Sequence, residues 1–128
     1  MDTKLYLAIV AVLSVVYGIL FVLFPSEAVA FYGATEPNPA AAYNVQFFGS
    51  ALLALGVIVW SARSFRDWDA VRSVLIGALV GNIVGLLLAI WGIKQGLVNQ
   101  MGWSSVVVYV VLTAGALYCL RTKVAQTA

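Results

Sequence analysis

The stretch Leu5–Phe24, LYLAIVAVLSVVYGILFVLF, contains twenty residues and no charged side chain. A bilayer core about 30 Å thick requires about 20 apolar residues in a helix that rises about 1.5 Å per residue. The stretch is therefore long and apolar enough to cross a membrane. Because hydrocarbon offers no water to the backbone, each crossing segment must satisfy its own hydrogen bonds, which predicts a helix.

Three further uncharged runs of this length follow along the chain. They are Ala40–Ala62, Ser73–Ile93 and Gln95–Leu120, and within the last run we expect Trp103–Leu120 to lie in the membrane because the residues before it are more polar. The four spans account for nearly the whole chain. The sequence therefore predicts an all-α integral membrane four-helix bundle that forms a single domain over residues 1–128.

The composition excludes several classes of protein. Apolar residues make up 63% of the chain and charged residues 9%, against about 45–50% and about 25% in soluble domains. A soluble fold of 128 residues could not bury this much apolar surface. The net charge of +2 is too small and too dispersed to indicate nucleic-acid binding.

The residues that usually carry chemistry are scarce. The chain has no histidine and a single cysteine, Cys119, so it can form no intrachain disulfide and no Cys/His metal site. All five carboxylate side chains lie near the N-terminus or in the loops, where no general acid–base pair can be placed in a membrane cleft. We therefore predict a protein that is not an enzyme and that uses no metal or cofactor.

The charged residues predict the orientation. Six basic residues belong to the N-terminal end, the connection between the second and third runs, and the C-terminal end: Lys4, Arg63, Arg66, Arg72, Arg121 and Lys123. The opposite side has Lys94, Glu27 and Glu36. Basic residues stay on the cytoplasmic side, so we expect an inner-membrane protein with both termini in the cytoplasm. We interpret the three arginines of the connection as topology determinants that contact anionic lipid, with a specific partner site as the alternative.

The connection from Pro25 to Pro39 contains its own signals. Pro25 suits a first helical position and Gly33 a left-handed stop, which predicts a short interfacial helix around Ala28, Val29, Phe31 and Tyr32. Asn38 can cap the second span ahead of Pro39, and Asp67 or Asp69 can cap the third. Ala28-Val29-Ala30 resembles a signal-peptidase site, but the preceding apolar run exceeds a secretory h-region, and we expect an uncleaved signal anchor.

Aromatic residues occur near the ends of the spans. They are Tyr6, Tyr43, Trp60, Trp91, Trp103 and Tyr118. Amphipathic rings favour the headgroup region, so we predict that these side chains are interfacial anchors.

Small residues recur every four positions in the third span, at Ser73, Gly77, Gly81, Gly85 and Ala89. Such a ridge lets another helix backbone approach closely. Two interpretations stay open: packing within one bundle, or dimerisation through the ridge.

Each span also has one hydrogen-bonding side chain near its midpoint, and these are Ser14, Ser50, Asn82 and Thr113. Asn82 is the costliest of them to bury. One interpretation is a mid-membrane pocket for a ligand, and the other is hydrogen bonding between helices.

Three segments, Gly18–Pro25, Phe31–Gly33 and Phe47–Gly56, resemble small bacterial four-span proteins of the DoxX-like and neighbouring uncharacterised families. The association of DoxX with membrane-bound sulfur and quinone redox complexes implies an accessory-subunit role. No functional residue is matched by this resemblance.

These patterns favour a protein that acts through contact, as an accessory, assembly or self-associating subunit whose partners are the bilayer and other membrane subunits or itself. The alternative is a lipid-, quinone- or small-solute-binding protein or facilitator that uses the pocket around Asn82.

Overall fold

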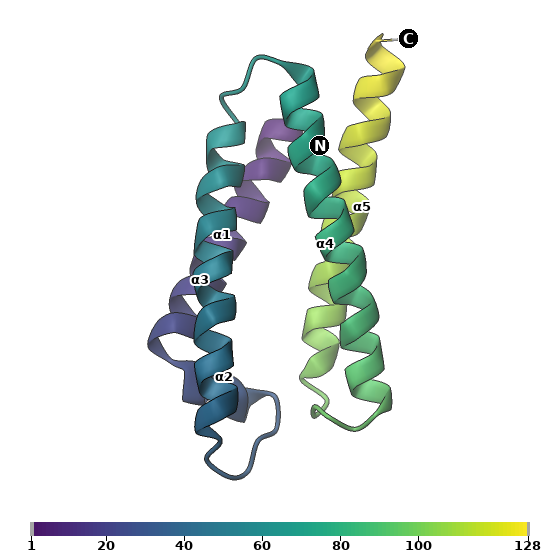
Figure 1. The fold of residues 1–128 in the computed structure, drawn as a ribbon. Coiled ribbons are helices and arrows are strands. Elements are labelled where there is room, and N and C mark those ends of the chain that lie inside the picture. Colours follow the sequence, from purple (N-terminus) through teal and green to yellow (C-terminus); the bar gives the residue numbers. More distant parts are fainter. Residues whose placement is uncertain (1, 128) are drawn as a thin grey trace.

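The computed structural model describes residues 2–127, and the side chains of residues 2–123. The chain folds into five helices in the order α1 (Thr3–Leu23), α2 (Pro25–Phe31), α3 (Pro39–Ala62), α4 (Trp68–Lys94) and α5 (Gly102–Thr127) (Figure 1). All of these except α2 are long and apolar enough to cross a membrane. The predicted all-helical class is confirmed. Each predicted span lies within one long helix, except that Phe24 falls just beyond the end of α1.

The predicted cap begins α3. The Oδ1 atom of Asn38 accepts a hydrogen bond from the backbone N–H of Ala41 at 3.0 Å, and Pro39 occupies the first turn, where it needs no donor. Of the two candidates for α4, Asp67 is the cap, and its Oδ1 atom accepts from the Asp69 N–H at 3.1 Å.

The short helix expected after the first span is α2. It begins at Pro25, and Gly33 follows its end with a φ of +110°, in the left-handed region that favours glycine. The helix itself is confirmed, while its position at a membrane interface stays a prediction.

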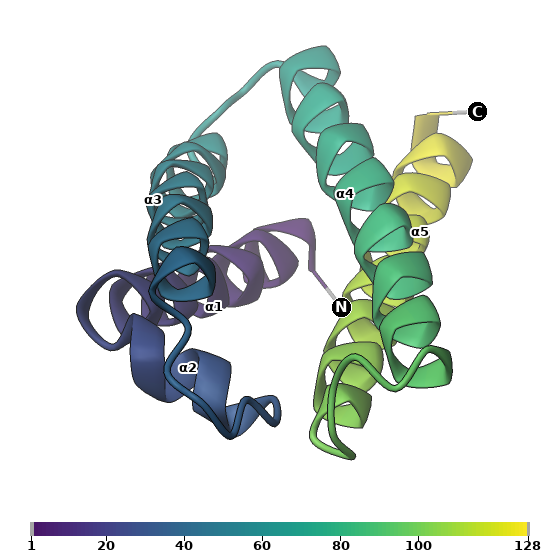
Figure 2. The same ribbon diagram turned by 60° about the horizontal axis from the view of Figure 1, so that its bottom comes forward.

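The long helices form two antiparallel pairs, α1 with α3 and α4 with α5 (Figures 1 and 2). The predicted bundle therefore consists of two helix pairs, and most of the packing lies within each pair rather than between the pairs.

Glycines hold α1 and α3 at close range. A Cβ atom added to Gly18 would lie 2.9 Å from the carbonyl oxygen of Gly49, and one added to Gly49 would lie 2.9 Å from the carbonyl oxygen of Gly18. A Cβ atom on Gly56 would come within 2.6 Å of Val15. The two backbones therefore pack directly against each other, as small residues allow in membrane helices.

The two pairs meet in a core near the end that contains the N-terminus and the α3–α4 connection (Figure 1). Its buried members come from all four long helices: Tyr6, Leu7, Val10, Ala11, Val59, Ala62, Val71, Leu75, Leu112, Ala116 and Cys119. The hydroxyl of Tyr6 donates a hydrogen bond to the carbonyl oxygen of Leu112 at 2.8 Å, which joins α1 to α5.

Asn99 joins the pairs at the opposite end. Its Nδ2 atom donates to the carbonyl oxygen of Phe31 at 3.0 Å, and its backbone N–H donates to the carbonyl oxygen of Tyr32 at 3.0 Å. The hydroxyls of Tyr32 and Ser105 are also hydrogen-bonded at 3.0 Å. The α4–α5 connection is therefore attached to the end of α2.

We predict that Gly49→Val lowers the free energy of unfolding by about 1–3 kcal/mol, because the new side chain would force α1 and α3 apart. Ala54→Val is the matched control, since Ala54 is exposed on the same helix and its replacement should be close to neutral. Unfolding of the two variants in mild detergent by increasing amounts of a denaturing detergent measures the difference. Equal losses in both variants would contradict close packing at Gly49.

Candidate functional site

Asn82 lies near the middle of α4 and is only 9% exposed. Its side chain is beside the Tyr6 hydroxyl. However, its Nδ2 atom is buried and forms no hydrogen bond with any residue that the structure describes. A buried donor without an acceptor costs stability, so this amide is a candidate contact for a ligand or another chain.

The register of α4 and α5 places Thr113 at the level of Asn82. The ring of Tyr109 covers Gly85 so closely that a Cβ atom on this glycine would lie 2.5 Å from it. Because α4 and α5 run antiparallel, moving three residues back from Gly85 on α4 corresponds to moving three residues forward from Tyr109 on α5. These steps lead to Asn82 and Leu112, and Thr113 follows Leu112 in the chain. The Oγ1 atom of Thr113 is also buried without a hydrogen bond among the described residues.

Tyr6 in the first turn of α1, Asn82 on α4 and Thr113 on α5 are therefore the polar side chains of this region, and we call them the polar cluster. The predicted pocket combined Asn82 and Thr113 with Ser14 and Ser50. Ser14 is buried on α1, two helical turns beyond Tyr6, and Ser50 is exposed on α3. The register of α4 and α5 thus places Asn82 and Thr113 at one level, and the predicted ligand pocket stays a prediction.

The interpretation of Tyr6 as an interfacial anchor is wrong. Its side chain is 2% exposed and its hydroxyl is bonded to the Leu112 carbonyl. The other predicted anchors have half or more of their side-chain surface exposed: Tyr43, Trp60, Trp91, Trp103 and Tyr118. The signal in the sequence was that Tyr6 shares one helix face with Val10, which is also buried.

The small-residue ridge of α4 is divided between two environments. Tyr109 covers Gly85, and Ala89 is partly buried. Gly77 and Gly81 are exposed, and a Cβ atom on either would meet no heavy atom within 4 Å beyond its own helix, among the described residues. Ser73 is also exposed. Packing within one chain therefore accounts for the end of the ridge but not for Gly77 and Gly81. The closest contact between helix backbones in the described structure is made by glycines of α1 and α3.

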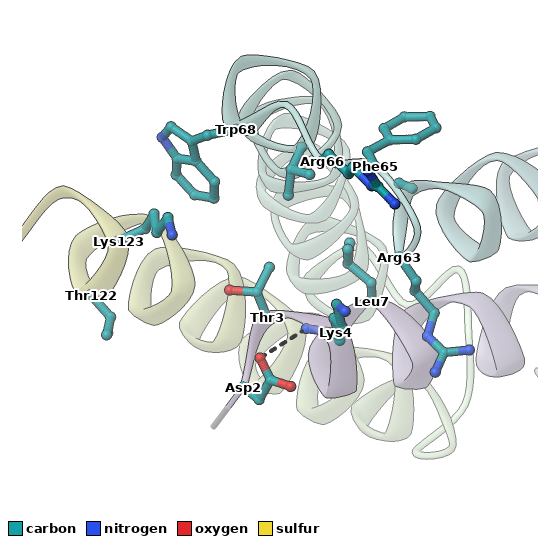
Figure 3. Close-up of a pocket in the computed structure, with 12 residues that line it drawn as sticks. Asp2, Thr3, Lys4, Leu7, Arg63, Phe65, Arg66, Trp68, Thr122 and Lys123 are labelled. Atoms are coloured by element: carbon teal, nitrogen blue, oxygen red, sulfur yellow. Dashed lines mark hydrogen bonds between the residues drawn. The ribbon is translucent and has the colours of Figure 1, made fainter. Parts of the chain in front are cut away.

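A pocket of about 290 Å³ lies where the long helices end near the N-terminus (Figure 3). We call it the basic pocket, because Lys4, Arg63, Arg66 and Lys123 line it, together with the single carboxylate of Asp2. Trp68 and Phe65 contribute aromatic surface. Arg72, the third arginine of the connection, does not line this pocket. No local pattern in the sequence joins Lys4 and Lys123 to Arg63 and Arg66, and the prediction did not include the pocket.

A family profile matches residues 1–120, and it is described as Domain of unknown function (DUF8292). The chain belongs to this family. No curated protein and no solved structure matches the chain. The resemblance to DoxX-like proteins is not tested by the family match and stays a prediction.

We predict that Asn82→Leu and Thr113→Val leave the free energy of unfolding unchanged or raise it by about 1 kcal/mol, because each removes a buried group that makes no hydrogen bond of good geometry among the described residues. Tyr6→Phe should lower it by about 1 kcal/mol, because it removes the bond to the Leu112 carbonyl. Unfolding of the three variants in the same detergent tests this order. A larger loss for Asn82→Leu than for Tyr6→Phe would show that the amide is already paired within the fold.

Proposed function

We propose that this member of the family is a multi-pass inner-membrane protein without catalytic machinery. In this proposal it acts through helix contact, as a self-associating or accessory subunit. Lys4, Arg63, Arg66, Arg72 and the basic residues at the end of α5 belong to one end of the helix pairs, whereas Lys94 ends α4 at the other (Figure 1). This asymmetry supports a cytoplasmic position for both termini.

The observation that carries the proposal is the open space over Gly77 and Gly81. Helix α4 is also the long helix that the chain itself covers least. Only 6% of the most apolar 18-residue stretch of α4 is buried by the rest of the protein, against 33% of the corresponding stretch in α1 and 22% in each of α3 and α5. Small exposed residues spaced by four positions let another backbone approach closely, and such contact drives helix association where lipid removes the hydrophobic force.

A second copy of the chain is the partner that this surface fits best. In a symmetric dimer the same face must pack against itself, so it must be free of protruding groups on both sides. Gly77 and Gly81 meet this requirement, and the Oγ atom of Ser73 donates back to the Asp69 carbonyl at 2.8 Å, which leaves this hydroxyl hydrogen-bonded within its own helix.

We predict that Gly81→Leu converts a dimer into a monomer without loss of helix content, because the added side chain enters open space in the monomer but the contact surface of the dimer. Ala51→Leu, at an exposed position of α3, is the matched control and should retain the dimer. Native mass spectrometry of protein released from mild detergent reports the number of subunits. A mass spectrum in which the parent protein is a monomer, with neither a second copy nor another membrane subunit, would contradict the proposal.

A second candidate function is the binding of a lipid, a quinone or a small solute at the polar cluster of Tyr6, Asn82 and Thr113. The Nδ2 atom of Asn82 and the Oγ1 atom of Thr113 favour it, because both are buried without a hydrogen bond among the described residues and polar ligand atoms could satisfy them.

For this candidate we predict that Asn82→Leu abolishes retention of a co-purifying ligand while the helices remain folded. Native mass spectrometry with lipids retained detects the ligand, and Ser50→Ala is the control because Ser50 is exposed on α3. Undiminished retention by Asn82→Leu would exclude this site.

A further inference from the structure

The basic pocket combines cationic side chains from three separate parts of the chain. Lys4 comes from the start of α1, Arg63 and Arg66 from the end of α3 and its connection to α4, and Lys123 from α5. Figure 3 shows these residues arranged around one space, with Trp68 beside Lys123. Four positive charges therefore face one negative charge, that of Asp2.

The described residues neutralise little of the positive charge of Lys4, Arg63 and Arg66. Asp2 caps α1, and its Oδ1 atom accepts the backbone N–H of Lys4 at 3.3 Å. Among the described residues, Lys4, Arg63 and Arg66 form no ion pair with a carboxylate. The Nε atom of Arg63 is buried without an acceptor in the described part of the chain, and its guanidinium lies 4.2 Å from the centre of the Trp60 ring. A bound anion would supply the acceptors that the fold lacks.

The remaining walls of the pocket are apolar. Leu7, Ala62 and Val71 belong to the core or its edge, and Phe65 and Trp68 add aromatic rings. The charged groups therefore lie directly beside surface that continues into the apolar spans. A free anion needs only the cations, whereas a phospholipid needs both kinds of surface, one for its phosphate and one for its hydrocarbon.

We propose that the basic pocket binds a phosphate group, and specifically the phosphate headgroup of an anionic phospholipid. Basic pockets between membrane helices on the cytoplasmic side suit such headgroups. The bound phosphate would connect α1, the α3–α4 connection and α5, and so would hold the two helix pairs together at this end. This inference does not depend on self-association through α4, because none of the ridge residues lines the pocket.

The test compares two double variants that remove the same charge from the same end of the molecule. Lys4→Gln with Arg66→Gln removes two residues that line the basic pocket, and Arg72→Gln with Arg121→Gln removes two that do not. The full chain is purified in an uncharged detergent. Its affinity is then measured for short-chain phosphatidylglycerol, short-chain phosphatidylcholine and inorganic phosphate, and helix content and thermal unfolding confirm that each variant is folded.

We expect the pocket variant to bind phosphatidylglycerol about tenfold or more weakly, because charge-assisted hydrogen bonds to the phosphate are lost. The control variant should change by less than about twofold, since Arg72 and Arg121 do not line the pocket. Phosphatidylglycerol should also raise the unfolding temperature of the parent but not of the pocket variant. Binding of phosphatidylglycerol alone identifies a lipid, whereas inorganic phosphate that binds with the same dependence on Lys4 and Arg66 identifies a free phosphate as the source of the same chemistry.

Two results would overturn the proposal. Equal weakening in both double variants would show only diffuse attraction to a basic surface. Equal affinity of the parent for phosphatidylcholine and phosphatidylglycerol would show that the cations do not select the ligand. Because Gly81→Leu leaves the pocket intact, it should bind phosphatidylglycerol normally even if it becomes monomeric.

Discussion

The direct contact between the backbones of Gly18 and Gly49 is the interaction on which the arrangement of the helices depends. Side chains gain little when they leave lipid for the interior of a bundle, so membrane helices associate mainly through close packing and hydrogen bonds. The contact keeps α1 against α3 and leaves α4 and α5 to form their own pair, in which Tyr109 covers Gly85. The division into two pairs follows from where the smallest residues meet.

The two pairs are held mainly near their ends. Tyr6 and the buried core join them at the end that contains the basic pocket, and Asn99 attaches the α4–α5 connection to α2 at the other end. One long helix, α4, therefore has two small residues, Gly77 and Gly81, that no other described helix covers, and the basic pocket has three cations, Lys4, Arg63 and Arg66, that no described carboxylate pairs with. We propose that a second helix covers the first feature and that a phosphate-bearing lipid occupies the second.

Patterns confined to one segment were predictable from the sequence. The four long helices follow from hydropathy. The caps at Asn38 and at Asp67, one of the two candidates for α4, and the short helix after Pro25 depend on neighbours within a few residues. The burial of Asn82 at the middle of its span followed from the same hydropathy pattern. For these features the local chemistry of the chain is sufficient.

Contacts between segments were decided only by the tertiary structure. The ridge of α4 and the glycines of α1 and α3 are equally small, and nothing within either sequence pattern determines which of them meets another helix. Tyr6 is an aromatic residue near the end of a span, which is typical of an interfacial anchor. In the structure its hydroxyl instead donates a hydrogen bond to the Leu112 carbonyl of α5. The basic pocket brings together residues as distant as Lys4 and Lys123. Hydropathy determines which segments become helices because it acts on each segment alone, whereas packing determines their neighbours because it depends on the shapes of two surfaces at once.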